Sequence, residues 1–194
     1  SHQIKKNVKI IKIDISNSKN LDKHFAGVDY VFHLAAQSLV KKSYSDPAYT
    51  WTTNTIGTLN VLESLRELKK KCIAVIITSD KSYKNLEIKR GYKEDDILGG
   101  KDPYSASKGM AEIAIRSYVE SYFREVGCNV RVGVTRAGNV IGGGDMKKDR
   151  IVPDVIKSLQ NKTPLFIRNP HATRPWQHVF DVLSGYLILG VKLS

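Results

Sequence analysis

Two short stretches of the sequence bring together side chains that can move protons. Tyr104 and Lys108 are four residues apart in "YSASK", so a helix would stack them on one face. An adjacent ammonium favours the phenolate and lowers the pKa of the phenol, so this pair could take a proton from a hydroxyl group. The stretch "TSDKSY" places the hydroxyl of Ser79, the carboxylate of Asp80 and the ammonium of Lys81 side by side. These five residues are the candidate catalytic groups.

The surrounding residues predict where these groups lie. The apolar run "CIAVII" before "TSDKSY" is typical of a buried strand, and "DP" before "YSASK" is typical of a helix start. Two other predicted strands end in small or polar residues, "HLAAQS" and "RAGNVIGGGD". In doubly wound sheets the loops beyond the strand ends form the ligand crevice, so we expect the site there. Taken alone, Tyr104 and Lys108 would also fit a helix surface, Asp80 a helix cap, and Lys81 a solvated charge.

Short β-branched runs alternate with longer amphipathic segments along the chain, which predicts an α/β fold with a parallel sheet and helices on both faces. The predicted strands are 8–13, 30–35, 72–78, 129–136 and 164–168. The predicted helices are about 18–26, 48–70, 104–126, 151–161 and 181–192. We therefore expect a doubly wound, Rossmann-like sheet.

Composition narrows the class of protein. The 194 residues are 41% hydrophobic, enough for one full core. The formal charge of +12 is spread over lysine clusters without aromatic interleaving, which indicates a solvated surface and no nucleic-acid partner. No apolar run approaches the roughly 20 residues that span a bilayer, and the N-terminus lacks the apolar core of a signal peptide, so we expect no membrane partner and a cytoplasmic location.

The cysteines and histidines do not indicate a metal site. Cys72 and Cys128 lie beside or within predicted strands and are expected to be buried thiols. His171 and His178 have no Cys or carboxylate at ligand spacing, so no metal is predicted. His33 lies in a predicted strand and is expected to be a core histidine or a neighbour of the site.

Several motifs together resemble a known family. They are "FHLAAQSLVKKSYSDP", "NTIGTLNVLE", "TSDKSY", "DPYSASK", "RAGNVIGGGD", "RIVPD" and "IRNPHATRPWQHV". The sequence resembles the extended short-chain dehydrogenases that act on nucleotide sugars, and within them the CDP-glucose 4,6-dehydratases, from about Val8 to Leu193. The resemblance implies NAD as the cofactor, a nucleotide sugar as the partner and a role in deoxysugar biosynthesis, such as that of O-antigen.

The resemblance also implies roles for single residues. The cofactor would contact Asp14, Ile15, Leu34, Ala35, Ala36, Thr78, Tyr104, Lys108 and Val140. The substrate would contact Gln37, Ser79, Asn139 and Arg174, the last of which would grip the phosphates. Tyr104 would be the base at the C4 hydroxyl, Lys81 the base at C5, and Asp80 the acid at C6. Hydride would pass from C4 to NAD and return to C6 after water loss, leaving a 4-keto-6-deoxy sugar.

The sequence departs from this family in two respects. The related dTDP-glucose dehydratases carry a glutamate where this chain has Lys81. The Gly-x-x-Gly-x-x-Gly fingerprint of the first β-α-β unit is also missing. We therefore expect an internal fragment, with a partial NAD-binding domain at 1–145 and the start of a substrate-binding region at 146–194. We expect the fragment alone to be inactive and the full-length protein to be a homo-oligomer.

Two other functions remain open. A 4-epimerase, or a dehydratase for another nucleotide sugar, would keep Tyr104 and Lys108 but has less use for Ser79, Asp80 and Lys81. A non-catalytic fragment or a nucleotide-binding module would use none of the five residues for turnover.

Overall fold

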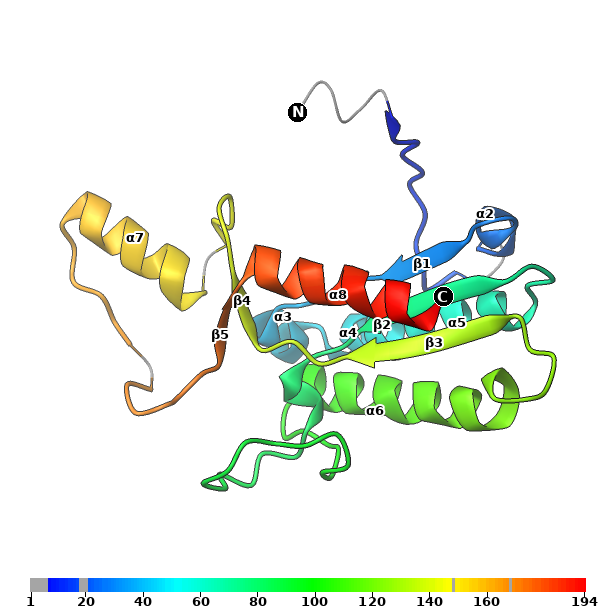
Figure 1. The fold of residues 1–194 in the computed structure, drawn as a ribbon. Helices are drawn as coiled ribbons and strands as arrows, with labels where there is room; N and C mark the ends of the chain where they lie inside the picture. The colour runs from blue at the N-terminus through cyan, green and yellow to red at the C-terminus, as the bar shows by residue number, and fades with distance from the viewer. Residues whose placement is uncertain (1–6, 18–20, 148, 168) are drawn as a thin grey trace.

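The computed structural model describes residues 7–17, 21–147, 149–167 and 169–194, and it shows a parallel sheet between helices (Figure 1). In chain order the elements are α2 (Asp22–Phe25), β1 (Tyr30–His33), α3 (Val40–Ser45), α4 (Pro47–Trp51), α5 (Gly57–Arg66), β2 (Cys72–Ile77), α6 (Pro103–Tyr118), β3 (Val130–Thr135), β4 (Asn139–Ile141), α7 (Ile151–Asn161), β5 (Trp176–His178) and α8 (Val179–Leu193). Short helical turns of other pitch lie at Thr52–Ile56, Asp80–Ser82 and Val119–Phe123.

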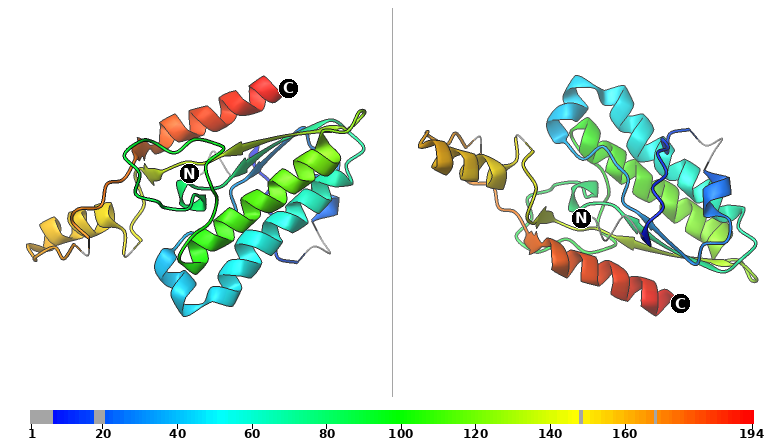
Figure 2. Two further views of the ribbon diagram at one scale, coloured as in Figure 1. Left: turned by 90° about the horizontal axis from the view of Figure 1, so that it is seen from below. Right: turned by 90° about the horizontal axis from the view of Figure 1, so that it is seen from above.

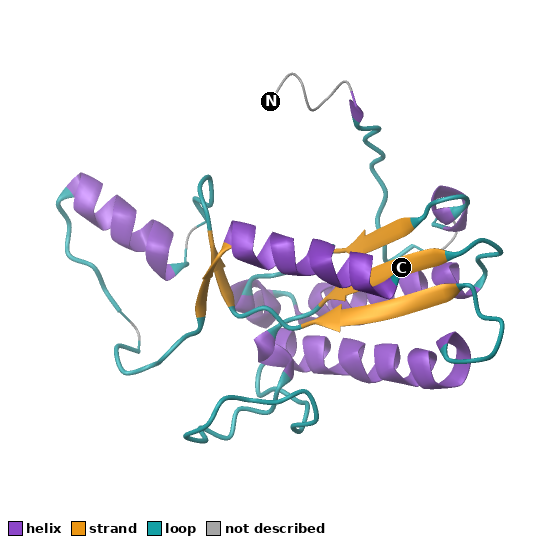
Figure 3. Ribbon diagram, in the orientation of Figure 1, coloured by secondary structure: helices purple, strands orange, loops and turns teal. Residues whose placement is uncertain are grey.

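The main sheet has the order β1-β2-β3, and all its strands run parallel (Figure 3). Tyr30 lies opposite Ile73 in the β1–β2 pair, and Ile77 lies opposite Thr135 in the β2–β3 pair. All three strands therefore end at the same edge of the sheet. A second sheet is formed by β4 and β5, which also run parallel, with Asn139 opposite Trp176.

Helices cover both faces of the main sheet (Figure 2). On one face, Leu62 and Leu65 of α5 and Ile115 of α6 form a core with residues of β2 such as Ala74. On the other face, α8 packs its Val182 and Tyr186 against Val75. Because neighbouring residues of β2 point to opposite faces and both faces are buried, the strand is apolar throughout. The predicted doubly wound fold is confirmed.

The predicted helices are confirmed with small shifts at their ends. Helix α7 has the predicted bounds, 151–161, and α8 covers the predicted 181–192. The segment predicted as 48–70 forms α4, a π-helical turn and α5, and ends at Arg66. The segment 104–126 ends in a similar turn after Tyr118. Of the predicted helix 18–26, residues 22–25 form α2, and 18–20 lie outside the described residues.

Two predicted strands are wrong. Residues 8–13 run without regular structure, and their large apolar side chains are exposed. A strand requires a neighbouring strand that exchanges backbone hydrogen bonds with it, and no described strand lies beside this segment. Residues 164–167 are also irregular, which fits a segment that opens with Pro164, whereas residue 168 lies outside the described residues. The sequence analysis missed α3, β4 and β5, which are all short.

The boundary predicted near residue 145 stays a prediction. The chain passes from β3 to β4 over only three residues, 136–138, and Figure 1 shows α7 away from the main sheet.

The contact between β4 and β5 depends on a glycine. A Cβ atom at Gly138 would lie 2.7 Å from both the Cγ and the carbonyl oxygen of Pro175. We expect Gly138→Ala to lower the free energy of unfolding by about 1–3 kcal/mol, because backbone on the other side must move. Urea denaturation of the purified protein measures this. Gly143→Ala is the control, since a Cβ there meets nothing within 4 Å. Equal stability of the two variants would contradict the described approach of the strands.

Candidate active site

The turn after β2 carries three of the predicted catalytic residues. Ser79 begins the turn Asp80–Ser82, where its hydroxyl accepts a hydrogen bond from the backbone N–H of Lys81 at 3.2 Å. The backbone N–H of Asp80 donates to the carbonyl of Ala137 at 3.0 Å, which ties the turn to the segment after β3. The side chains of this turn are therefore held by the ends of two neighbouring strands.

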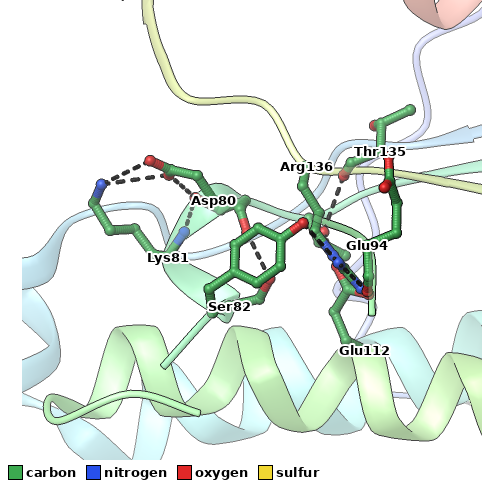
Figure 4. A network of polar contacts seen from close by, with 10 residues as sticks. Asp80, Lys81, Ser82, Glu94, Glu112, Thr135 and Arg136 are labelled. Carbon is green, nitrogen blue, oxygen red and sulfur yellow. Dashed lines mark hydrogen bonds and ion pairs between the residues drawn. The ribbon is translucent and has the colours of Figure 1, made fainter. Parts of the chain in front are cut away.

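Asp80 and Lys81 form an ion pair within this turn (Figure 4). The Nζ atom of Lys81 lies 3.1 Å from Oδ2 and 3.3 Å from Oδ1 of Asp80. The hydroxyl of Ser79 donates to Oδ1 of the same carboxylate at 3.1 Å. Both charged side chains are partly exposed, so a ligand in the crevice can reach them.

Helix α6 places Tyr104 and Lys108 beside the turn. The helix starts at Pro103, and the carboxylate of Asp102 caps it by accepting from the N–H and hydroxyl of Ser105 at 3.0 and 2.6 Å. Tyr104 and Lys108 are therefore one helical turn apart, as predicted, and they are only 8% and 7% exposed. The predicted pairing on one face of a helix is present.

The structure corrects the expected effect of Lys108 on the pKa of Tyr104. Burial of the phenol raises this pKa above its usual value. A hydrogen bond with Ser79 and the charge of Arg150 oppose the rise, while the carboxylates of Asp80 and Asp102 add to it. Desolvation therefore outweighs the charges nearby, and Tyr104 is a neutral phenol at neutral pH.

Lys108 is affected by burial in the opposite direction. Desolvation lowers the pKa of its ammonium to about 8, and the carboxylate of Glu112 partly opposes this. His33, at the end of β1, is also buried; desolvation and the charge of Lys108 lower the pKa of its imidazole to about 4. His33 Nε2 lies 3.0 Å from the hydroxyl of Thr58. The prediction that His33 is a core or neighbouring residue of the site is confirmed.

A groove lies between the segment that follows β1 and the π-helical turn Thr52–Ile56, and it has a volume of about 680 Å³. Its lining residues are Ile11, Lys12, Ile13, Asp14, Ile15, Ala35, Ala36, Tyr49 and Thr53. The groove thus joins Asp14 and Ile15 with Ala35 and Ala36, two pairs predicted to contact one ligand. Leu34, from the same predicted set, is exposed next to them.

Thr53 is a candidate ligand residue that the sequence analysis missed. Its hydroxyl is buried and has no hydrogen-bond partner among the described residues. The π-helical turn Thr52–Ile56 buries Thr53, Asn54 and Thr55 in succession, so Thr53 borders the groove while Asn54 turns toward Gln37. A buried hydroxyl without a partner is costly, so a polar ligand atom in the groove would satisfy it.

Gln37 is held by the protein itself. It is buried, its side-chain NH₂ donates to the hydroxyl of Thr50 at 2.9 Å, and its side-chain oxygen accepts from the N–H of Leu39 at 2.6 Å. Its backbone N–H donates to Asn54 at 2.8 Å. A contact of Gln37 with substrate stays a prediction.

The pairing of β4 with β5 brings Asn139 close to the segment with Arg174, whereas the side chains of Val140 and Thr78 have other surroundings. The N–H of Asn139 donates to the carbonyl of Pro175 at 2.8 Å, which places it beside the segment that carries Arg174. Arg174 is exposed, and its guanidinium donates to the neighbouring carbonyl of Thr173 at 2.6 Å. Val140 packs into the core near Tyr186. Thr78, at the end of β2, is buried and belongs to a separate polar network described below.

The described residues lack the features of a metal site and of a membrane span. No three His, Cys, Asp or Glu side chains of the described residues lie close enough together to hold a metal ion. No helix in the described part of the chain is both long and apolar enough to cross a bilayer. Cys72 is buried, whereas Cys128 is exposed, so the prediction of a buried thiol is wrong for Cys128.

A doubly wound sheet with a buried tyrosine and lysine at its carboxyl edge is the Rossmann-like arrangement of extended short-chain dehydrogenases. The chain belongs to the GDP-mannose 4,6 dehydratase family, which matches residues 1–189. The predicted family membership is confirmed.

Individual relatives agree with this membership. The chain is 45% identical over 168 residues to CDP-glucose 4,6-dehydratase of Salmonella typhimurium, covering 85% of this chain and 47% of the relative. It is 28% identical over 171 residues to UDP-glucose 4-epimerase of Mycoplasma pneumoniae, covering 82% of this chain and 50% of the relative. The chain thus spans about half the length of these curated relatives.

A solved structure shows the same fold. A double mutant of DesIV, a dTDP-glucose 4,6-dehydratase from Streptomyces venezuelae, with NAD bound, has a TM-score of 0.78 and 26% identity. The similarity covers 92% of this chain and 53% of DesIV.

The burial of Lys108 predicts a stability cost at neutral pH. Because the unfolded ammonium keeps its proton up to about pH 10.5 and the buried one only up to about 8, the folded state is penalised below pH 8. Lys108→Met should therefore raise the free energy of unfolding at pH 7 by about 3 kcal/mol. This gain should shrink between pH 8 and 10.5 and vanish above, because the unfolded chain then also loses the proton. Urea denaturation across this range measures it.

The matched control is Lys101→Met, which removes an exposed lysine just before α6. Its stability should stay within about 0.5 kcal/mol of the wild type at every pH. A Lys108→Met variant no more stable than the wild type at pH 7 would mean that the ammonium is solvated.

Proposed function

We propose that this chain is part of an NAD-dependent nucleotide-sugar 4,6-dehydratase whose substrate is CDP-glucose. The observation that carries the proposal is the turn after β2. There the carboxylate of Asp80 lies within hydrogen-bond distance of both the Ser79 hydroxyl and the Lys81 ammonium. Ser79 also lowers the pKa of the buried phenol of Tyr104, against the larger effect of burial. A base for oxidation and an acid and base for elimination thus stand side by side.

The groove supports NAD as the cofactor. NAD, when bound, accepts and returns a hydride. Asp14 and Ile15 would meet the adenine end, Ala35 and Ala36 would allow close approach, and the unpaired hydroxyl of Thr53 would gain a partner. Thr78, Lys108 and Val140, with Leu34 at the rim, would lie toward the nicotinamide end. Bound NAD in the DesIV structure supports this assignment.

Tyr104 and Ser79 would act at C4 of the sugar. As the C4 hydroxyl is oxidised, its proton passes to the oxygen of Tyr104, and Ser79 holds the C4 oxygen in place. Because burial raises the pKa of Tyr104, the phenol would first release its own proton to solvent water. The ammonium of Lys108, one turn further along α6, would stabilise the phenolate once it forms.

Asp80 and Lys81 would perform the elimination. The C4 ketone acidifies the C5 hydrogen, the Lys81 amine removes it, and Asp80 protonates the departing C6 hydroxyl. The reactive pair is a neutral Lys81 amine and a protonated Asp80, and it carries the same number of protons as the ion pair in the structure. Transfer of one proton across the 3.1 Å contact would convert the resting pair into the reactive one.

Two features bear on the substrate. The 45% identity to a CDP-glucose 4,6-dehydratase favours the CDP sugar. Arg174 directly precedes Pro175, whose carbonyl bonds to Asn139, and its exposed guanidinium would bind the diphosphate, since its planar fork suits phosphate oxygens. A homo-oligomeric state of the full-length protein stays a prediction.

A 4-epimerase is the second candidate, favoured by the similarity to UDP-glucose 4-epimerase. Epimerisation needs Tyr104 and Lys108 but no acid and base at C5 and C6. The Asp80–Lys81 pair therefore favours the dehydratase over the epimerase.

The function is tested with the full-length protein, supplied with NAD and CDP-glucose, dTDP-glucose or UDP-glucose in parallel. We expect CDP-glucose to give a 4-keto-6-deoxy sugar, detected by its ultraviolet absorbance in alkali, with the highest kcat/KM of the three. Product that is only the C4 epimer would support the second candidate. No conversion of any of the three would contradict both.

The role of Lys81 is tested by Lys81→Met in the full-length protein. The variant should still pass hydride to NAD but stall before water loss, because no base removes the C5 proton. A burst of NADH absorbance should appear without 4-keto-6-deoxy product, and turnover should fall by roughly 10²–10⁴-fold. Lys84→Met, in the exposed part of the same loop, is the control and should turn over normally. Exchange of the C5 hydrogen with solvent at the wild-type rate in Lys81→Met would refute the role.

A further inference from the structure

The proposed reaction does not use the buried ion pair between Glu112 and Arg136, which lies one turn of α6 beyond Lys108. Glu112 follows Lys108 by one turn of α6 and is only 5% exposed, and Arg136 directly follows β3. The Nε and Nη2 atoms of Arg136 each donate to a different oxygen of Glu112 at 2.8 Å (Figure 4). This two-pronged contact is the strong geometry for a guanidinium and a carboxylate.

Arg136 is itself fixed from the opposite side. Its Nη1 atom donates to the hydroxyl of Tyr83 at 2.8 Å and to the carbonyl of Glu94 at 2.9 Å. Its guanidinium also lies 4.7 Å from the centre of the Tyr83 ring, which stacks on Tyr92. The loop between the turn and α6 thus holds Arg136 against Glu112.

Glu112 has a second hydrogen-bond partner, and a second cation lies within reach of its carboxylate. Its Oε1 atom also accepts a hydrogen bond from the hydroxyl of Thr78 at the end of β2. Lys108 precedes it by four residues, a spacing at which side chains on a helix meet. Yet the Lys108 side chain has no hydrogen bond or ion pair within the described part of the chain, although the charge of Glu112 acts on it. Arg136 therefore occupies the carboxylate that Lys108 could otherwise bind.

A buried ion pair is weak evidence for stability, because desolvation offsets the attraction. The Arg136–Glu112 pair instead determines whether Glu112 can attract the Lys108 ammonium. If Glu112 turned to Lys108, the ammonium would be drawn away from Tyr104 and toward the middle of α6.

We propose that Arg136 is a positioning residue that binds Glu112 and so keeps it from pairing with Lys108, leaving the ammonium free to act beside Tyr104. This rests on the proposed function, because only a dehydrogenation step requires a free Lys108. The titratable groups that interact with Lys108 are Glu112 on its own helix and His33 on β1, and Tyr104 lies one helical turn before it. Across the turn after β2, Asp80 and Lys81 pair with each other.

The first test reads Lys108 directly and needs no turnover. The full-length protein is labelled at the lysine ε-carbon with an NMR-active isotope, and the Lys108 signal is assigned by its loss in Lys108→Met. In the wild type its titration midpoint should lie near pH 8. In Arg136→Met the midpoint should rise by roughly one to two pH units, because Glu112 then pairs with Lys108. The double variant Arg136→Met/Glu112→Gln should return it to the wild-type value or below.

The second test measures turnover. Arg136→Met should lower kcat by roughly 100-fold and leave KM for the nucleotide sugar within about threefold, since substrate binding is untouched. The double variant should recover at least tenfold of this loss, although it lacks one more side chain. Arg136→Lys keeps the cation and should lie between the wild type and Arg136→Met. A double variant no more active than Arg136→Met would overturn the proposal, as would an unchanged Lys108 midpoint in folded Arg136→Met.

The proposal stays testable if the Arg136 variants do not fold, which circular dichroism shows. Glu112→Gln alone should lower the Lys108 midpoint, because it removes the charge that raises it and leaves Arg136 unpaired. It should keep kcat within about tenfold of the wild type, because no carboxylate is left to draw the ammonium from Tyr104. A loss of kcat of roughly 100-fold or more in folded Glu112→Gln would overturn the proposal. A full-length protein that fails to convert any nucleotide sugar would sink the proposed function, whereas the titrations would still decide the role of Arg136.

Discussion

The site depends on the burial of β2 on every side. The strand is paired along both edges, and its side chains are covered by α5 and α6 on one face and by α8 on the other. A slip of one residue would turn every side chain of the strand to the opposite face, where different helices pack, so close packing on both faces fixes where the strand ends. The residues that follow it therefore emerge at a fixed point, between the ends of β1 and β3. The turn with Ser79, Asp80 and Lys81 takes its position from this constraint.

Helix α6 completes the site because it packs on the same strand. Its cap at Asp102 fixes where the helix begins, and its contact with the β2 core fixes which face turns inward. That inward face carries Tyr104, Lys108 and Glu112 in successive turns, all of them buried. Burial makes the ionic form of each costly, and the protein compensates Glu112 with an arginine but leaves Lys108 without a partner within the described residues. The different surroundings of the Glu112 and Lys108 charges on α6 thus follow from the way this helix packs on β2.

Local signals predicted much of this arrangement. The apolar run before Thr78 identified β2, and the Asp-Pro pair before Tyr104 identified the start of α6. The direction of the Tyr104 pKa could not be predicted, because it depends on how much protein surrounds the phenol. The irregular course of residues 8–13 also escaped prediction, since a strand forms only beside a partner that the local sequence does not specify. Thr53 was missed because its orientation depends on a π-helical turn, which has no clear sequence signature.

The two tryptophans of the chain lie in two different parts of the fold. Trp51 ends α4, where the chain enters the π-helical turn, whereas Trp176 pairs with Asn139 across the second sheet. Indole fluorescence responds to the polarity and contacts of its surroundings, so each ring reports on its own part of the fold. Replacing either tryptophan by phenylalanine would leave a single intrinsic optical probe. Comparison of the two variants during unfolding would therefore show, without any added dye, whether the second sheet and the helical layer come apart together.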